Sequence, residues 1–332
     1  MKRPIANSNF SSVNEIRATP TADAVSWVIV DESGESQRVD NFLLKHLKGV
    51  PKSHIYRILR SGEVRVNSKR VQAEYKLAVG DRVRIPPIRV AEATVRQVRV
   101  PVGKRLAERI LFEDDALLVI NKPAGLAVHG GSGVSLGAIE QLRAEFPQFR
   151  FLELAHRLDR ETSGVLLLAK KRSALTGLHA MLRDGGMDKR YLTLVAGQWK
   201  NGRQSVKLSL TKYLTPEGER RVSVDDDGQA AHTIFTLNEN FKDFSLLEAE
   251  LKTGRTHQIR VHLAHMGFPI AGDDKYGDFT LNKALPKQGL KRMFLHAHRV
   301  TFLHPLSRER TEIMAPLPTE LEAFLECLRS PS

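Results

Sequence analysis

The residues best suited to chemistry lie at positions 156–164, which read His-Arg-Leu-Asp-Arg-Glu-Thr-Ser-Gly. They come directly before an apolar run, 165–169, that predicts a buried strand, and loops held by such strands often carry function. Asp159 stands between Arg157 and Arg160, and the positive charge of arginine favours a negative carboxylate. We therefore expect Asp159 to act as a charged base or nucleophile, or else to be an ion-paired turn residue; the local sequence does not choose between the two.

A second polar cluster covers residues 254–262, Gly-Arg-Thr-His-Gln-Ile-Arg-Val-His. Thr256 as an N-cap and Gly267 as a stop predict a helix over 256–266. Arg260 then lies near the N-terminal end, where the helix dipole disfavours a cation. The position indicates either a carboxylate or phosphate partner for Arg260 or an ordinary surface arginine.

Metal and disulfide chemistry is not expected. His257, His262 and His265 are separated by five and three residues, which is not the usual i, i+4 metal pair with a nearby acid. The single cysteine, Cys327, allows neither an intrachain disulfide nor a four-cysteine zinc site.

A third candidate is Tyr191, which follows Lys189 and Arg190 at the start of a strand-like run. A tyrosine beside two cations could stack on a nucleobase. The simpler interpretation is a strand tyrosine that packs one face into the core.

The composition indicates a globular, basic protein. The chain has 332 residues, a formal net charge of +13, 41% hydrophobic and 27% charged residues. The longest apolar runs are far shorter than the roughly 18 residues of a membrane helix, and the N-terminus lacks the apolar core of a secretory signal. We expect a cytoplasmic protein, no membrane partner, and a polyanion as the first partner to consider. About 150 residues per domain suggests two domains.

Most of the excess charge lies in residues 36–98, which hold 14 Lys/Arg and 5 Asp/Glu, whereas residues 1–35 are slightly acidic and read as a flexible tail. The apolar pattern of 36–98 changes from helical spacing to a period of two after Gly62, which predicts two helices and then a small sheet. We expect an RNA-facing module with an outer set of basic residues: Lys45, Lys48, Lys52, Arg57, Arg60 and Arg65. The order of elements resembles the S4 RNA-binding domain, an α/β module.

The remainder divides into a linker over 99–109 and a larger domain over 110–326. Strand-like runs outnumber helical ones there, and they do not alternate with helices in βαβ fashion. This pattern predicts an α+β fold with a mainly antiparallel sheet.

Together these segments resemble the RluA-type RNA pseudouridine synthases. Residues 156–164, 189–191 and 254–262 resemble the three signature segments of the family and occur in its order. Residues 121–125, Asn-Lys-Pro-Ala-Gly, resemble its first motif, and residues 272–277, Gly-Asp-Asp-Lys-Tyr-Gly, its late turn. The S4-like module, with the phrases at 49–53 and 128–133, narrows the resemblance to the RluC type, which acts on large-subunit ribosomal RNA. It covers about residues 36–325.

The resemblance implies a role for each matched position. Asp159 corresponds to the catalytic aspartate, Arg260 to the arginine that keeps it ionised, and Tyr191 to a residue stacked near the uracil. The implied reaction breaks the C1′–N1 bond of uridine, turns the detached base and rejoins it through C5. It needs no cofactor and requires the uridine to be flipped from its stack. Attack on C1′ and removal of a sugar proton to give a glycal both remain open for Asp159.

Four further positions complete the implied site. Ile259 supplies an apolar wall, and Arg157 helps to displace or replace the flipped base, while Lys122 and Pro123 are architectural. The implied partner is 23S rRNA or a large-subunit assembly intermediate, and nothing in the sequence requires more than a monomer. The alternative function is a non-catalytic RNA-binding or assembly factor in which residues 36–98 do the work; signature segments around Asp159, which a pure binder would not need, argue against it.

Overall fold

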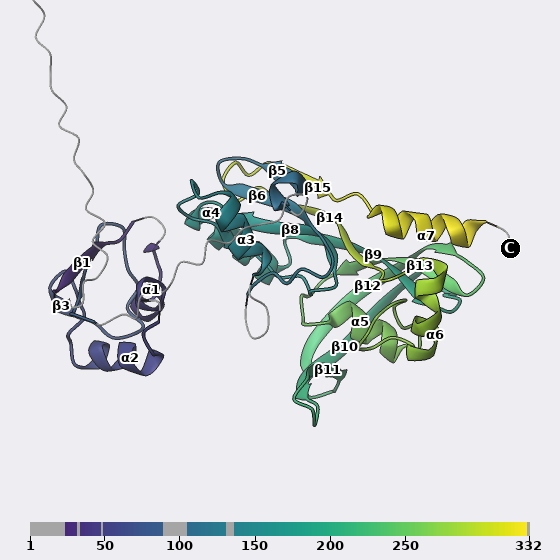
Figure 1. The fold of residues 1–332 in the computed structure, drawn as a ribbon, viewed down its shortest axis with the longest axis horizontal. Helices are drawn as coiled ribbons and strands as arrows, with labels where there is room; N and C mark the ends of the chain where they lie inside the picture. Colours follow the sequence, from purple (N-terminus) through teal and green to yellow (C-terminus); the bar gives the residue numbers. More distant parts are fainter. Residues whose placement is uncertain (1–23, 32–33, 48, 89–104, 131–135, 331–332) are drawn as a thin grey trace, which may run out of the picture. The chain divides into compact units, whose positions relative to one another are not determined.

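The structure is a computed structural model that describes residues 24–330 except 32–33, 48, 89–104 and 131–135. The chain divides into two compact units, Met1–Gln97 and Val98–Ser332 (Figure 1). No helix of the described residues is long and apolar enough to cross a membrane.

The first unit combines two helices with a four-stranded sheet of order β1-β4-β2-β3. The change of apolar period predicts the two helices and the strands that follow them, but not β1, which precedes the helices. Its core contains Val39, Phe42 and Leu43 from the first helix and Ile55 and Ile58 from the second. The helical spacing of these apolar residues places them on the faces that pack together, which leaves the basic residues outside. The elements are α1 (Val39–His46), α2 (Lys52–Arg60), β1 (Ser26–Ile29), β2 (Arg65–Val66), β3 (Lys69–Arg70) and β4 (Arg82–Ile85).

The strand β1 lies inside the segment 1–35 that the sequence predicts to be a flexible tail. It pairs antiparallel with β4, Ser26 opposite Ile85, and forms one edge of the sheet. The side chain of Trp27 is largely exposed, with the guanidinium of Arg82 5.1 Å from its ring. The pattern misleads because a serine occupies a buried position and the apolar Trp27 an exposed one. The rest of the predicted tail, 1–23, lies outside the described residues.

The second unit is built on one sheet of eleven strands. Nine of them follow the order β11-β10-β12-β13-β9-β14-β8-β6-β5, while β15 pairs with β14 and β7 with β8. All these pairings are antiparallel except β14 with β8, so the predicted α+β class with a mainly antiparallel sheet is confirmed. The strands are β5 (Ile110–Glu113), β6 (Leu117–Lys122), β7 (Glu153–Leu154), β8 (Ser163–Ala169), β9 (Asp188–Ala196), β10 (Arg203–Leu214), β11 (Arg220–Val224), β12 (Gln229–Asn240), β13 (Phe244–Leu251), β14 (Leu295–Leu303) and β15 (Arg310–Met314).

Helices cover both faces of this sheet (Figure 1). The strand β8 is buried along its whole length. Leu166 and Leu168 belong to the core cluster that also receives Ile259 and Leu263 of α5, whereas Leu167 packs with α4 on the other face. Burial of each such leucine stabilises the fold by about 1.5–3 kcal/mol. The helices are α3 (Ala138–Glu145), α4 (Arg172–Asp184), α5 (Gln258–His265), α6 (Phe279–Ala284) and α7 (Thr319–Arg329), with 3₁₀ turns η2 (Leu106–Arg109) and η3 (Leu285–Gln288).

The predicted linker, 99–109, overlaps an element of the second unit. Residues 99–104 lie outside the described part, but η2 follows directly. Leu106 is buried in the main core cluster, and its backbone N–H donates to the carboxylate of Glu145 at 3.0 Å. An element of the second unit therefore lies before the predicted boundary at 110, because the buried Leu106 anchors a turn that has no periodic pattern.

Candidate active site

A pocket of about 580 Å³ opens at the centre of the large sheet. Its walls come from the loop before β8, the start of β9 and the loop between β13 and α5. The strand pairings explain why these segments meet: Ala297 of β14 lies opposite both Gly164 of β8 and Tyr191 of β9, and Tyr191 lies opposite Ala249 of β13. The three sequence clusters singled out for chemistry are thus brought to one place.

The parallel pairing of β8 and β14 depends on a glycine. Gly164 has φ +110°, and a Cβ atom there would lie 2.2 Å from the carbonyl oxygen of Ala297. Only glycine combines this backbone conformation with so close an approach. It allows the two parallel strands to pair immediately after the loop that carries Asp159.

The loop that carries Asp159 is fixed from beneath by Lys122, the last residue of β6. The Lys122 ammonium donates to the carbonyl oxygens of Pro123, Leu126 and Arg160 at 2.9, 2.8 and 3.1 Å. Its side chain is fully buried, and this burial lowers the pKa of Lys122 to about 7. Lys122 therefore ties the segment after β6 to the residue next to Asp159, which is the architectural role implied by the resemblance.

Asp159 faces Arg260, across 101 positions of sequence. The Nη1 atom of Arg260 lies 3.4 Å from Oδ2 of Asp159, and the Asp159 side chain is 19% exposed in the pocket. The guanidinium stabilises a negative charge on this carboxylate. The sequence neighbours Arg157 and Arg160 do not do so: Arg160 donates to the carbonyl of Gly125 at 3.0 Å and both are exposed.

Arg260 is itself held by two further carboxylates. Its Nε and Nη2 donate to Asp273 at 2.7 and 2.6 Å, a bidentate pair with both side chains almost fully buried, and Nη2 also donates to Asp274 at 3.3 Å. Burial alone would lower the pKa of Arg260, but the hydrogen bonds and charge of Asp273, with Asp159 and Asp274, raise it. Arg260 is thus a fixed positive charge, and the carboxylate partner expected for this cation exists.

Asp273 owes its position to the turn at 272–277. Burial would raise the pKa of Asp273, but Arg260 and the backbone N–H groups of Lys275 and Tyr276 lower it. These N–H groups donate to Oδ1 at 2.8 and 3.1 Å. The late turn of the sequence therefore serves to hold the arginine that faces Asp159, a role that the sequence analysis does not assign.

The helix that carries Arg260 begins later than the sequence predicts. The prediction places its N-cap at Thr256, whereas α5 starts at Gln258 and His257 takes a left-handed conformation with φ +53°. The buried carboxamide oxygen of Gln258 accepts hydrogen bonds from the Thr253 hydroxyl and the Arg255 backbone N–H, which stabilises a turn in place of a first helical turn. Arg260 consequently points back towards Asp159 from the first turn of α5.

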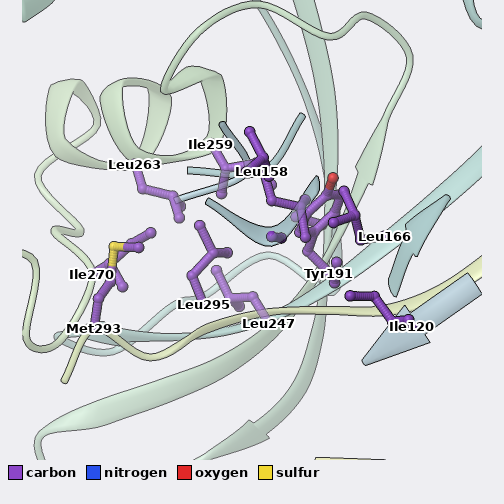
Figure 2. Packing of buried hydrophobic residues seen from close by; sticks show 14 of the residues in the cluster. Ile120, Leu158, Leu166, Tyr191, Leu247, Ile259, Leu263, Ile270, Met293 and Leu295 are labelled. Atoms are coloured by element: carbon purple, nitrogen blue, oxygen red, sulfur yellow. The ribbon is translucent and has the colours of Figure 1, made fainter. Parts of the chain in front are cut away.

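Tyr191 and Ile259 form part of the apolar wall, with Leu158 beside them (Figure 2). Tyr191 is only 8% exposed, and this burial, followed by the negative charge of Asp159, raises its pKa. The two interpretations of Tyr191 are therefore compatible, because the ring packs in the core cluster and also borders the pocket.

The rest of the pocket is strongly basic. Of the described residues that line it, one, Asp159, is acidic and six are arginine or lysine. The exposed Arg157 is among them, as expected. Two of the six, Arg183 of α4 and Lys252 of the loop before α5, lie outside the clusters that the sequence singles out. The six are Arg157, Arg183, Lys189, Lys252, Arg255 and Arg260.

The basic residues predicted for the first unit lie on its surface, apart from Lys48, which is outside the described residues. Arg57 contacts the His54 ring, and Arg60 and Arg65 donate to the backbone carbonyls of Tyr56 and Gly62, so these contacts do not involve carboxylates. Such cations remain available to an anionic partner. The exposed set consists of Lys45, Lys52, Arg57, Arg60 and Arg65.

Two more residues at the site escaped the sequence analysis as functional groups. The sequence offers His257 only as a member of a rejected metal site, yet its Nε2 lies 3.8 Å from Oδ2 of Asp159. Tyr276 contacts His257, and its ring lies 5.1 Å from the guanidinium carbon of Arg260. Within the part of the chain that the structure describes, no group of three or more His, Cys, Asp or Glu residues could hold a metal ion.

The pocket places one carboxylate among basic side chains, an arrangement suited to chemistry on a polyanion. A family model for RNA pseudouridylate synthases matches residues 116–265, and one for the S4 domain matches residues 37–83. The ribosomal large subunit pseudouridine synthase C of Escherichia coli (strain K12) is 53% identical over 316 residues, which cover 94% of this chain and 98% of the relative. The Yersinia pestis protein of the same name is 55% identical over 304 residues, 91% of this chain and 94% of the relative. This chain belongs to the RNA pseudouridylate synthase family.

A solved structure agrees with this assignment. Human RNA pseudouridylate synthase domain containing 4 is 27% identical, with a TM-score of 0.57, and the match covers 68% of this chain and 95% of that one. The predicted family, fold and enzyme class are confirmed, and so is the S4-type module before the catalytic domain.

Proposed function

We propose that the chain converts specific uridines of 23S ribosomal RNA to pseudouridine with Asp159 as its catalytic residue. The observation that carries this proposal is the Asp159 carboxylate, placed 3.4 Å from the buried Arg260 in a basic pocket large enough for a nucleotide. The relatives named as synthases of the large ribosomal subunit support the choice of RNA. Ribosomal RNA as substrate implies action in the cytoplasm.

The chemistry assigns a task to each group. Asp159 either attacks C1′ or removes the 2′ proton as the C1′–N1 bond breaks, and the uracil leaves with the bonding electrons. The detached base turns within the walls formed by Tyr191 and Ile259, and C5 then bonds to C1′. That bond displaces the Asp159 carboxylate from C1′ on the first route, and on the glycal route the proton held by Asp159 returns to C2′. The C5 hydrogen leaves as a proton and N1 gains one, so no oxidant or reductant is consumed. Arg260 pairs with the Asp159 carboxylate and orients it for each step.

The basic residues supply affinity and position the RNA. Arg157, at the exposed edge of the pocket, is suited to fill the place of the flipped base or to hold its phosphate. The exposed cations of the S4-type unit contact the phosphates of the same RNA as a second, separate region. A monomer holds every residue that this mechanism uses. The same reaction applies whether the substrate is free 23S rRNA or an assembly intermediate of the large subunit.

Release of tritium from RNA labelled at uridine C5 tests the substrate directly, because bond formation at C5 must expel that hydrogen. We expect release from 23S rRNA or from a large-subunit precursor, and none above background from 16S rRNA prepared in the same way. Release from 16S rRNA alone, or from none of the three, would contradict the proposal.

A further inference from the structure

His257 is the one described pocket residue besides Arg260 that approaches the carboxylate of Asp159 closely enough to pair with its charge. Its Nε2 and Nη1 of Arg260 both face Oδ2, at 3.8 and 3.4 Å. Oδ1 is therefore the oxygen left for the sugar of a bound uridine. A group that fixes Oδ2 also sets the direction of Oδ1.

The hydrogen bonds of Tyr276 favour one tautomer of His257. The Tyr276 hydroxyl oxygen accepts from the backbone N–H of Val222 at 2.9 Å and lies 2.8 Å from Nδ1 of His257. A hydroxyl has one proton, and donation of that proton to Nδ1 satisfies both side chains. In neutral His257 the ring proton then lies on Nε2, the nitrogen that faces Asp159.

The charge around His257 supports a neutral ring. Its neighbours are Asp159, Asp273, Arg260, Lys275 and Tyr276. Burial lowers the pKa of His257, and the attraction of the two carboxylates is opposed by Arg260 and Lys275. The left-handed backbone of His257, with φ +53°, aims the ring into this position rather than along α5. A strained non-glycine residue at an active site is a common sign of such a constraint.

We propose that His257 is a positioning residue for Asp159: Tyr276 holds it as the Nε2–H form, and Nε2–H donates to Oδ2 of Asp159 when uridine binds, which turns Oδ1 towards the sugar. The distance of 3.8 Å exceeds a hydrogen bond, and catalytic hydrogen bonds commonly shorten in the substrate complex. This inference rests on the proposed role of Asp159 and adds a second group that orients it.

Three variants test this inference in the full-length protein with 23S rRNA. His257→Ala removes the donor, so we expect the single-turnover rate to fall by roughly 10- to 100-fold, the loss of one hydrogen bond to a charged group, with little change in the RNA dissociation constant. His257→Gln keeps a donor and recovers most of that rate. Tyr276→Phe keeps the ring over Arg260 and gives an intermediate loss. His265→Gln, on the exposed end of the same helix, is the matched control and stays at the wild-type rate.

The tautomer of His257 provides a second test, because a purely structural role would not depend on which ring nitrogen carries the proton. Nitrogen-15 NMR of the histidine rings should show His257 as the Nε2–H form in the wild type and a mixture of forms in Tyr276→Phe. His257→Ala with the full rate, or a wild-type Nδ1–H form, would overturn the inference while Asp159→Asn remains inactive and the proposed function stands. If His257→Ala does not fold, Tyr276→Phe with the full rate and an unchanged tautomer overturns it equally. A wild type without turnover on any rRNA would overturn both.

Discussion

At the scale of single residues, the site is a small set of charges with one fixed centre. Arg260 is held by Asp273 in a buried bidentate pair and also donates to Asp274, whereas its third nitrogen, Nη1, faces Asp159. One carboxylate, Asp273, therefore holds Arg260 in place, and a different carboxylate, Asp159, is the one that Arg260 orients. Because a buried charge that loses its partner is costly, the pair should matter for folding as well as for the reaction.

The two neighbouring aspartates allow this separation to be tested. We expect Asp273→Asn to lower the free energy of unfolding by about 3 kcal/mol, the cost of breaking a buried ion pair, and to reduce turnover strongly. Asp274→Asn is the matched control: its side chain is 66% exposed, so the change should cost under about 1 kcal/mol. Urea unfolding and tritium release on both variants measure the two effects. Equal losses of stability would show that Asp273 is not the residue that holds Arg260.

The sequence predicted the chemical types at this scale better than their contacts. The Asp159 cluster stood out because charged residues come directly before an apolar run typical of a buried strand, and Arg260 because a cation near a helix N-terminus is unfavourable. The contact between them spans 101 positions, and no local pattern could give it. Asp273 was visible only as part of a turn, since its partner comes from another element.

At the scale of elements, the site depends on the pairing of β8 with β14, the one parallel pairing among the described strands of the sheet. The predicted strands around it were found because continuous apolar runs such as 165–169 mark buried strands. No continuous apolar run marks the long hairpin of β10 and β11, because it is polar and half exposed. The start of α5 was misplaced because Gln258, rather than Thr256, organises the turn.

Substitution of Gly164 tests the importance of the pairing between β8 and β14. Gly164→Ala adds a Cβ atom 2.2 Å from the Ala297 carbonyl at φ +110°, so we expect a loss of well over about 1 kcal/mol and a distorted site with low turnover. Gly185→Ala is the control, since Gly185 has φ +75° but nothing within 4 Å, and only the conformational cost of about 1 kcal/mol applies. Thermal unfolding compares the two. Similar losses would mean that the close approach of β8 and β14 is not what requires a glycine.

The pairing of β8 with β14 also includes a buried histidine, His296, that links the stability of the fold to pH. Nδ1 of His296 lies 2.9 Å from the Ser163 hydroxyl and Nε2 3.2 Å from the Ala315 carbonyl, and burial lowers the pKa of His296 to about 4. The unfolded chain, with a histidine pKa near 6.5, binds more protons between pH 6.5 and 4, so stability falls as the pH is lowered through this range. We expect His296 to contribute about 1 kcal/mol per pH unit there. Urea unfolding of His296→Gln should give a shallower slope than the wild type, and an unchanged slope would contradict the assignment.

At the scale of the whole molecule, the chain combines a basic RNA-binding unit with a catalytic unit. Composition already indicated a polyanion as partner, because the excess charge is concentrated in residues 36–98. The domain limits were less predictable. An edge strand at 26–29 and a turn at 106–109 each belong to a unit through a few tertiary contacts rather than through a periodic pattern.

Salt dependence of RNA binding tests the division of labour between the units. A variant with Lys52, Arg57, Arg60 and Arg65 all changed to Gln should bind more weakly and lose about 0.7–0.9 in the salt slope for each phosphate contact removed. The control changes four exposed cations of the catalytic unit that lie away from the pocket, Lys283, Lys287, Lys291 and Arg310, and should shift the slope less. Fluorescence anisotropy with a 23S rRNA fragment at several salt concentrations gives both values. An equal shift would indicate binding through net charge alone.

The measurement that tests the central claim most directly is tritium release from C5-labelled 23S rRNA by the wild type and by Asp159→Asn, at saturating RNA. The amide keeps the shape of the side chain but has neither a negative charge nor a nucleophilic oxygen, so we expect turnover to fall by at least about 1000-fold while RNA affinity and unfolding stay close to wild type. Turnover by Asp159→Asn within about tenfold of the wild type would show that the carboxylate beside Arg260 is not the catalytic group.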